Sequence, residues 1–170
     1  MLRPIFKWSL AGAAIAALAG GCTQKTFHVE TVIAAEPAEV WEVISEASSY
    51  PDWNPVFVEV VGDYALGREV LNRVLEPGGE ILEITAEVTV LEPDRELRQK
   101  GGVPGVLTFD HRWLLEPVDD GTKVTQHEVD RGIGLWFWNS DWIEPAYANV
   151  NRALADRVKL LRGSEEQAQP

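Results

Sequence analysis

Apolar and polar residues alternate along most of the middle of this chain. The clearest stretch is "EILEITAEVTVLE", in which every second residue is apolar: Leu82, Ile84, Ala86, Val88 and Val90. A period of two puts successive side chains on opposite faces of a β-strand, so we expect one face to be buried and the other to meet solvent. Five further segments show the same pattern: "VFVEVVGDY", "REVLNRVLE", "ELRQKG", "LTFDHRWLLEP" and "KVTQHEVDRG".

Turns are predicted between these strand segments, and one more strand is predicted near the start of the chain. Consecutive segments are separated by "ALG", "PGG", "PDR", "GGVPG" and "VDDGT". Stretches of this composition favour hairpin turns. Near the start of the chain, "KTFHVETVIAA" is rich in β-branched residues and predicts a first strand. Seven strands joined mainly by hairpins predict an antiparallel sheet.

Two segments follow the helical period instead. "PAEVWEVISEAS" gathers its apolar residues on one helical face, and Pro37 suits the first turn of a helix. Pro51 and Pro55 then leave room for at most a short helical turn. The final segment carries an apolar stripe at steps of three and four: Ile143, Tyr147, Val150, Leu154, Val158 and Leu161. We expect a long helix there, beginning near Ser140 or Asp141 and capped by Gly163, with "SEEQAQP" as a solvated tail.

The order of these elements defines the fold class. A strand, a helix and a short helical segment precede six strands and a long helix, which is an α+β arrangement. A seven-stranded sheet with one long helix to cover it must curl around that helix to bury its apolar face. We therefore expect one curved antiparallel sheet around a long C-terminal helix.

The first residues of the chain do not fit this domain. "MLRPIFK" carries Arg3 and Lys7 without an acid, and the apolar run after it is shorter than the ~20 residues of a membrane-spanning helix. This pattern is typical of a secretory signal, and Cys22 lies at the expected cleavage point. We predict a signal peptide at 1–21, a tether at 22–26, one domain at 27–163 and a flexible tail at 164–170.

The segment around Cys22, "LAGGC", resembles the lipobox of bacterial lipoproteins, with Leu18 displaced by one position. The resemblance implies that Cys22 is lipidated and becomes the N-terminus. The other interpretation is an ordinary secretory signal followed by a free thiol. The lipoprotein interpretation predicts an exported protein, anchored to a bacterial membrane and facing the periplasm.

Composition narrows the choice of partners. The chain of 170 residues has 27 acidic and 15 basic residues and a net charge of −12. An acidic surface repels phosphate backbones, which argues against nucleic acid as a partner. Anionic headgroups are repelled as well, so attachment to a membrane is expected to depend on the acyl chains. The sequence does not set the oligomeric state.

Three segments carry a family resemblance: "VIAAEPAEVWEVISEASSYPDWNPVF", "HRWLLEPVDDGTKVTQHEVDRGIG" and "NRALADRVKLL". In this order they resemble the START-like helix-grip (SRPBCC) superfamily, in its polyketide cyclase/dehydrase-like branch. The resemblance covers about residues 27–162. It implies an apolar chamber between the sheet and the last helix, entered beside the loop that precedes this helix.

Aromatic residues concentrate next to this predicted entrance. "RGIGLWFWNSDW" contains Trp136, Phe137, Trp138 and Trp142. Their rings could plug the end of the sheet, form a wall or gate of the chamber, or touch a membrane, since indole suits an apolar wall and a headgroup zone alike. Trp53 has two interpretations as well: packing beneath the short helix, with Asn54 capping a turn, or a part of the chamber wall.

Polar candidates lie on the last two strands. His111 and Trp113 share one strand face, as do Gln126, Glu128 and Asp130 on the next strand, and the family register points both sets inward. Buried carboxyl groups there would have raised pKa values and could act as acid, base or hydrogen-bonding anchor. The alternative is a polar strand whose groups are simply satisfied by hydrogen bonds and have no functional role. Asp130 replaces an aromatic residue that is more usual in the family.

These observations give a predicted site and two functional hypotheses. The predicted ligand-binding residues are Trp53, Phe109, His111, Trp113, Gln126, Glu128, Trp136, Trp138 and Tyr147. The first hypothesis is a lipid-anchored protein that binds a hydrophobic small molecule such as a lipid, isoprenoid or polyketide-like compound, and the second is a cyclase, dehydratase or hydrolase that uses His111, Glu128 or Asp130. No metal site or cofactor is expected, because the three histidines lack ligand spacing and no phosphate-binding loop is present.

Overall fold

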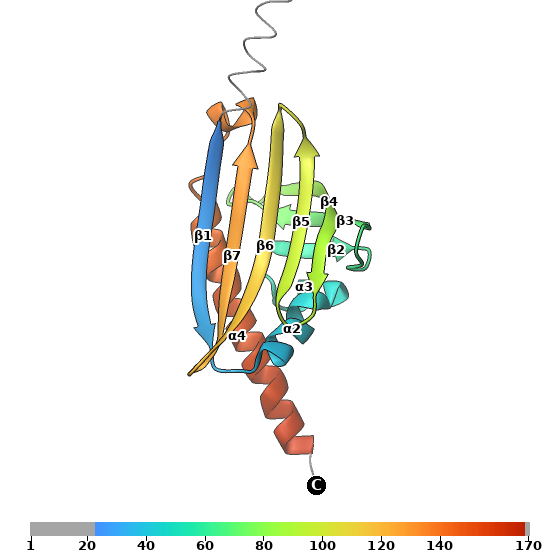
Figure 1. The fold of residues 1–170 in the computed structure, drawn as a ribbon, viewed down its shortest axis with the longest axis vertical. Coiled ribbons are helices and arrows are strands. Elements are labelled where there is room, and N and C mark those ends of the chain that lie inside the picture. The colour runs from blue at the N-terminus through green and yellow to red at the C-terminus, as the bar shows by residue number, and fades with distance from the viewer. Residues whose placement is uncertain (1–22, 169–170) are drawn as a thin grey trace, which may run out of the picture.

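The computed structural model describes residues 23–168 of the chain. In this range it contains one antiparallel sheet in the order β1-β7-β6-β5-β4-β3-β2 (Figure 1). The strands are β1 (Gln24–Ile33), β2 (Phe57–Val61), β3 (Glu69–Leu75), β4 (Ile81–Glu92), β5 (Glu96–Val103), β6 (Leu107–Val118) and β7 (Gly121–Arg131). The helical elements are α2 (Pro37–Ser45), η1 (Ala47–Ser49), α3 (Tyr50–Trp53), η2 (Ile133–Trp136) and α4 (Ile143–Ala168).

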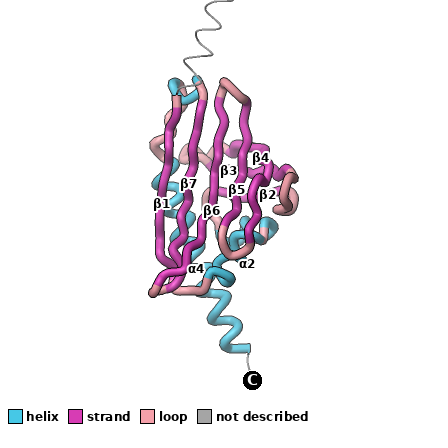
Figure 2. Tube along the Cα trace, in the orientation of Figure 1, coloured by secondary structure: helices cyan, strands magenta, loops and turns pink. Residues whose placement is uncertain are grey.

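The sheet is curled, and α4 lies along its inner side. In Figure 1, β1, β7, β6 and β5 run lengthwise while β2, β3 and the first part of β4 cross behind them, and Figure 2 shows α4 passing behind β1 and β7. The curl lets a single helix bury much of one face of the sheet, which explains why seven strands need only one long helix. The predicted α+β fold, with a curved seven-stranded sheet around the C-terminal helix, is confirmed.

Strand β4 departs in part from the simple alternation that its sequence predicts. Ala86 and Val88 are fully buried as expected, but Leu82 is 42% exposed, because it lies near the hairpin with β3. The pairing register of β4 with β5 shifts between Val88 and Val90. A shift of this kind is a β-bulge, which bends the strand and increases its twist.

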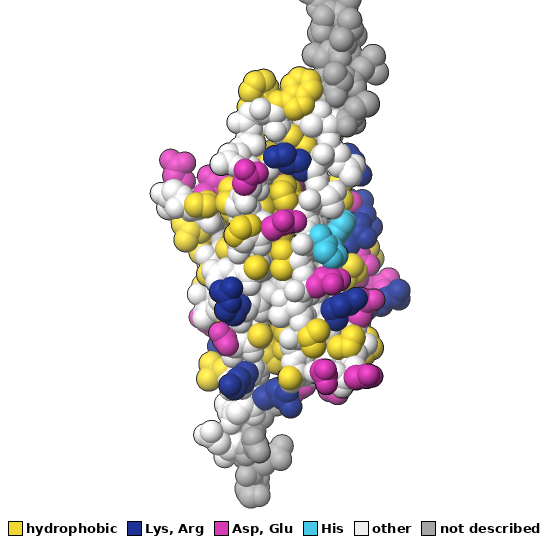
Figure 3. Space-filling view, turned by 90° about the vertical axis from the view of Figure 1, so that its left-hand side faces the viewer, with side chains coloured by type: hydrophobic (Ala, Val, Ile, Leu, Met, Phe, Trp, Pro, Cys, Tyr) yellow, Lys and Arg dark blue, Asp and Glu magenta, His cyan; other side chains and the backbone are white. Residues whose placement is uncertain are grey.

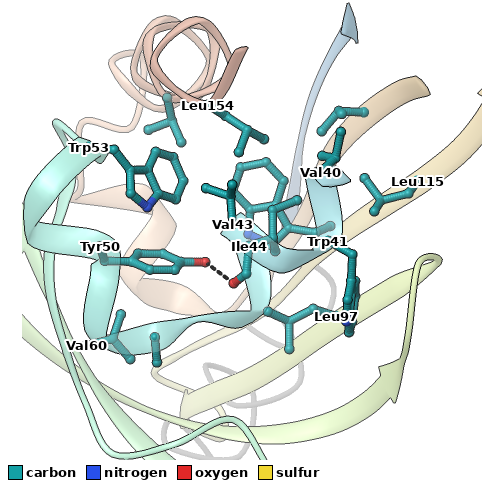
Figure 4. Packing of buried hydrophobic residues seen from close by; sticks show 14 of the residues in the cluster. Val40, Trp41, Val43, Ile44, Tyr50, Trp53, Val60, Leu97, Leu115 and Leu154 are labelled. Carbon is teal, nitrogen blue, oxygen red and sulfur yellow. Dashed lines mark hydrogen bonds between the residues drawn. The ribbon is translucent and has the colours of Figure 1, made fainter. Parts of the chain in front are cut away.

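The two short helices close one end of the curled sheet and form the centre of the core. A capping box with Glu36 and Glu39 starts α2, which buries Val40 and Ile44 completely. Figure 4 shows these side chains packed below α4, with the hydroxyl group of Tyr50 donating a 3.0 Å hydrogen bond to the carbonyl oxygen of Ile44. This bond fixes α3 against the end of α2.

Helix α4 begins at Ile143, two or three residues later than expected, and also ends later than expected. Its stripe of apolar residues is buried from Ile143 to Val158, whereas Leu161, predicted to belong to it, is 37% exposed. Pro145 falls in the first turn, where a missing N–H has little cost. The helix continues past Gly163 to Ala168, so the predicted cap at Gly163 is wrong. Glycine lowers helix stability by only about 1 kcal/mol relative to alanine, and the residues after it include Glu, Gln and Ala, which favour helix.

The predicted tether is strand for most of its length. β1 begins at Gln24, which pairs with Arg131 of β7, so residues 24–26 belong to the sheet. The register explains this, because β7 is long enough to pair with them. Cys22 and the predicted signal peptide lie outside the described residues. Among the residues described, no helix is both long and apolar enough to cross a bilayer.

Candidate functional site

A cavity of about 510 Å³ lies inside the curled sheet. Its walls come from the inner faces of β2 to β7, from α3 and α4, and from the segment that joins η2 to α4. Most of the lining is apolar or aromatic, including Val56, Val74, Ile84, Phe109, Trp113 and Trp142. Ligand pockets for small molecules typically have volumes of roughly 300–1,000 Å³, so this cavity can hold a molecule of that class.

A row of polar side chains crosses this apolar cavity. Glu128 on β7 is the direct cross-strand neighbour of His111 on β6, and His111 is the neighbour of Gln99 on β5. Gln99 continues the row to Asn72 on β3, whose Nδ2 donates a 2.9 Å hydrogen bond to Gln99 Oε1. All four side chains are buried and line the cavity. A ligand therefore meets hydrogen-bonding groups in the interior as well as apolar walls.

At the β7 end of the row, Glu128 and Asp130 form a carboxyl pair. Burial, together with the negative charge of Asp130, raises the pKa of Glu128 to about 8. Burial also raises the pKa of Asp130 to about 6, while a hydrogen bond with Glu128 and the charge of Lys25 oppose the increase. At neutral pH, Glu128 is therefore the protonated partner and Asp130 the ionised one.

Tyr147 of α4 fixes this pair from the other side of the cavity. Its hydroxyl group donates a 2.7 Å hydrogen bond to Glu128 Oε2. One oxygen of Asp130, Oδ1, is buried and has no hydrogen-bond partner among the described residues. Because an unpaired buried acceptor costs about 1–3 kcal/mol, a ligand with a donor group at this position would be favoured.

His111 is held as a neutral imidazole. Its Nε2 lies 3.3 Å from Gln126 Oε1, and Gln126 Nε2 donates to Asn151 Oδ1 at 2.7 Å and to the carbonyl oxygen of Tyr147 at 3.1 Å. Because the amide nitrogen of Gln126 is occupied in this way, its Oε1 accepts a hydrogen bond from Nε2–H of His111, and Nδ1 of His111 carries the lone pair. Burial lowers the pKa of His111 to about 4, which excludes the charged form at neutral pH.

The other end of the row contains a second unpaired acceptor. Asn72 Oδ1 is buried without a partner among the described residues. Tyr64 lies next to this end, and burial raises the pKa of its hydroxyl group to about 12, so it stays protonated. The cavity thus offers unpaired acceptors both at Asn72 and at Asp130.

The structure brings together most of the residues predicted from the sequence. Seven of them line the cavity: Phe109, His111, Trp113, Glu128, Asp130, Trp138 and Tyr147. The inward direction of Gln126, Glu128 and Asp130 follows the predicted strand face, and all three are buried. Gln126, however, does not line the cavity, because its amide is fully used in positioning His111 and Asn151.

Two tryptophans of the predicted site also lie outside the cavity lining. Trp53 packs in the core, with its ring centroid 5.0 Å from that of Tyr50, and Asn54 Oδ1 accepts two backbone hydrogen bonds in the turn after it. This is the packing interpretation of Trp53. Trp136 is 56% exposed, because it ends η2 and points away from the cavity.

The aromatic cluster near the entrance therefore has two parts. Trp138 and Trp142 stand edge to face with centroids 6.5 Å apart and form part of the cavity wall. Phe137 lines the cavity but is 86% exposed, which places it at the rim. The cluster is therefore neither a solid plug nor a uniform wall, because two of its rings form part of the wall and Phe137 lies at the rim.

Sequence reasoning missed Asn72, Gln99 and Tyr64. A signal for the first two was present: Asn72 lies between Val70 and Val74 on the apolar face of its strand, and Gln99 shares the face of Leu97. A polar residue on an otherwise buried strand face indicates a buried hydrogen bond or a ligand contact. Within residues 23–168, no group of three or more His, Cys, Asp or Glu side chains is placed to hold a metal ion.

The fold and cavity have relatives among known proteins. A family model described as "Polyketide cyclase / dehydrase and lipid transport" matches residues 24–159. The chain belongs to this family. Membership confirms the resemblance to the START-like, polyketide cyclase/dehydrase-like proteins that the sequence shows. A search of curated proteins finds no match.

Solved structures share the fold of this polyketide cyclase/dehydrase family member at low sequence identity. The di-domain ARO/CYC StfQ from the steffimycin biosynthetic pathway superposes with a TM-score of 0.70 at 11% identity, over 89% of this chain and 56% of that one. A protein of unknown function from Staphylococcus aureus gives 0.66 at 11% identity, covering 83% and 97%. An uncharacterized protein from Rhizobium leguminosarum gives 0.64 at 16% identity, covering 81% and 95%. At these identities the likeness concerns the fold alone.

Proposed function

We propose that this protein binds a hydrophobic small molecule, such as a lipid, isoprenoid or polyketide-like compound, while a lipid on Cys22 anchors it to a bacterial membrane. The observation that carries the binding proposal is the cavity of about 510 Å³, with apolar walls and a buried polar row. Burial of apolar ligand surface contributes roughly 25 cal/mol per Å², which supports binding without a catalytic group. Family membership is consistent with such a ligand.

The polar row restricts the class of ligand. Asn72 Oδ1 and Asp130 Oδ1 are both buried acceptors that lack a partner in the described chain. A ligand with a hydroxyl or other donor group can satisfy one of them, whereas a pure hydrocarbon leaves both unpaired. We therefore expect an amphiphilic compound, apolar for most of its length and with at least one hydrogen-bond donor.

The binding proposal is tested by the ligand that the full-length protein carries. The protein is extracted from membranes in mild detergent, and bound compounds are identified by organic extraction and mass spectrometry. An apolar, hydroxyl-bearing compound at near-equal molar ratio supports the proposal. If nothing is bound and no member of a panel of lipids and isoprenoid alcohols raises the melting temperature, the proposal is wrong.

A cavity-filling variant provides the matched control. Ile84 is partly buried and lines the cavity, so Ile84→Trp fills part of the space where a ligand would lie. Val32 is 53% exposed, and Val32→Trp places the same ring on the surface of β1. Loss of the bound compound in the first variant and its retention in the second assigns the compound to the cavity. The mass of the N-terminal peptide tests the lipid on Cys22 separately.

The carboxyl pair favours a second candidate function, that of an enzyme. Glu128, protonated at neutral pH, can donate a proton inside the cavity, and ionised Asp130 or neutral His111 can accept one, as a cyclase or dehydratase requires. Conversion of the identified ligand by wild-type protein, lost in Glu128→Gln, would support this candidate. If wild-type protein binds the ligand but leaves it chemically unchanged after incubation, the enzyme candidate is wrong and only the binding function is supported.

A further inference from the structure

One end of the molecule carries an exposed apolar surface that the cavity does not use. We name it the apolar tip and define it by four residues: Val103, Val106, Trp136 and Phe137. Their exposed fractions are 60%, 52%, 56% and 86%. They come from two segments, the turn between β5 and β6 and the end of η2, which both lie at the upper end in Figure 1. Hydrophobic side chains gather at the same end in the space-filling view (Figure 3).

Backbone contacts hold the two segments of the apolar tip together. The N–H of Gly134 donates a 2.8 Å hydrogen bond to the carbonyl oxygen of Val106. At Gly132, φ is +137°, and a Cβ atom added there would lie 2.3 Å from the same oxygen. Only glycine permits this close approach. The two segments of the apolar tip are therefore fixed relative to each other and form one continuous surface.

The charge around the apolar tip differs from that of the rest of the protein. Acidic residues outnumber basic ones 27 to 15 in the whole chain. Yet the segments 23–29, 100–109 and 131–140, which form this end, contain Lys25, Lys100 and Arg131 and no acidic residue. Of these basic residues, Lys100 forms a 3.2 Å ion pair with Asp110, the residue directly after the second segment. Arg131 forms no ion pair within the described residues. An apolar surface with basic neighbours is suited to an interface that carries anionic headgroups.

The start of the described chain joins the same end. Trp136 Nε1 donates a 2.9 Å hydrogen bond to the hydroxyl oxygen of Thr23, and the N–H of Gly132 donates a 3.2 Å bond to the carbonyl oxygen of Thr23. Cys22 directly precedes Thr23 in the sequence. Consecutive Cα atoms are ~3.8 Å apart, so a lipid on Cys22 would enter the bilayer beside the tip.

We infer that the apolar tip docks on the surface of the anchoring membrane, so that the cavity exchanges its ligand with the bilayer at this end. The inference rests on the lipid anchor of the proposed function. Phe137 and Val106 belong both to the tip and to the cavity lining, so the rim of the cavity faces the docking surface. Indole and phenyl rings partition well into the interfacial zone of a bilayer. An apolar ligand could then pass between bilayer and cavity without crossing open water.

The depth of a spin label in vesicles tests the docking. Val103→Cys places a nitroxide on the tip, and Leu160→Cys places one on an exposed site near the C-terminal end of α4, which extends from the opposite end of the molecule (Figure 1). Full-length protein is reconstituted in vesicles of phosphatidylethanolamine and phosphatidylglycerol at 3:1. We expect the label at 103 to collide mainly with dissolved oxygen, and the label at 160 to collide mainly with a water-soluble nickel complex.

A matched pair of charge variants then tests whether the apolar tip makes the docking contact. Phe137→Asp adds an acid to the tip at a position that packs little, and Leu160→Asp adds one at the other end. With Phe137→Asp, the label at 103 should return to water while the protein still floats with the vesicles. With Leu160→Asp, it should stay in the bilayer. A label at 103 that is aqueous in otherwise unchanged, vesicle-bound protein overturns the inference and leaves the anchor intact.

Two remaining outcomes concern a free thiol at Cys22 and self-association through the tip. Wild-type protein takes up the label only if Cys22 has a free thiol, in which case the anchor is refuted, and docking is measured again with Cys22→Ser added. Docking in that background still supports the tip as a membrane surface. Dipolar broadening at 103 without oxygen exposure indicates a second copy of the chain on the tip and overturns the inference.

Discussion

Replacing Glu128 by glutamine removes the carboxyl group that the fold keeps protonated at neutral pH. The glutamine Oε1 can still accept the hydrogen bond from Tyr147, and its amide can donate to Asp130, so the local geometry can be retained. The variant loses only the ionisable carboxyl group of residue 128 and therefore its titration with pH. The pKa of Glu128 is about 8 in the folded protein, against 4.5 for the unconstrained group. Between these values the folded state holds a proton that the unfolded state has lost, so the free energy of unfolding falls as pH rises.

The window from pH 6.5 to 8 isolates this effect. The pKa of Asp130 is raised only to about 6, so above pH 6.5 it is mostly ionised in both states. Burial lowers the pKa of His111 to about 4, and burial and Arg112 lower that of His127. The stability that these histidines contribute rises slightly between pH 6.5 and 8 as the unfolded chain loses its histidine protons, and it does so equally in wild type and in Glu128→Gln. The difference between the two proteins therefore reports Glu128, at up to about 1.4 kcal/mol per pH unit, or about 2 kcal/mol across the window.

Urea unfolding curves at pH 6.5, 7, 7.5 and 8 measure this difference. Wild-type protein is expected to lose about 2 kcal/mol more than Glu128→Gln over this range. Glu87→Gln, which changes an exposed carboxyl group on β4, serves as the matched control and should run parallel to wild type. Parallel curves for wild type and Glu128→Gln would refute the assignment of a protonated Glu128 and, with it, the acid in the second candidate function.

Three further substitutions test the packing that shapes the cavity. Asn54→Ala removes an acceptor of two backbone hydrogen bonds at 2.8 and 3.0 Å and should lower the free energy of unfolding by about 1–3 kcal/mol in denaturant titration. Leu154→Ala deletes a fully buried side chain where α4 meets the core and should lower it by about 2–5 kcal/mol by the same measurement. Gly101→Ala places a Cβ atom 2.3 Å from the carbonyl oxygen of Thr85 and 2.6 Å from the ring of Phe109. We expect this change to lower the melting temperature and, by pushing the ring into the cavity, to reduce the amount of bound compound found by mass spectrometry.

The sequence predicts the fold well because each element repeats its pattern over many residues. Six strands alternate with a period of two, and α4 keeps its apolar stripe from Ile143 to Leu161, so errors at single positions do not change the interpretation. The ends of elements are less predictable. Gly163 is a helix breaker by propensity, but its cost of about 1 kcal/mol is small against the rest of a long helix.

The sequence predicts cavity residues only where the alternation of a strand shows which side chains point inward. The alternation of β6 and β7 places His111, Glu128 and Asp130 inside, and the structure agrees. The contact between Asn72 and Gln99 is beyond this reasoning, because β3 and β5 are separated by β4 in the sheet. The side chains of Asn72 and Gln99 meet because the sheet is curved there. This curvature depends on the register shift in β4, which the sequence pattern does not show.

For the proposed class of ligand, we expect selection to depend more on the polar row than on the apolar walls. One additional buried CH₂ group changes the binding free energy by only about 0.8 kcal/mol, so apolar walls alone separate similar lipids poorly. An acceptor left unpaired costs about 1–3 kcal/mol. Asn72 Oδ1 and Asp130 Oδ1, at the two ends of the row, therefore discriminate between compounds that carry a donor and compounds that do not. Because neither atom has a partner among the described residues, a matching amphiphile should stabilise the protein more than a hydrocarbon of equal size.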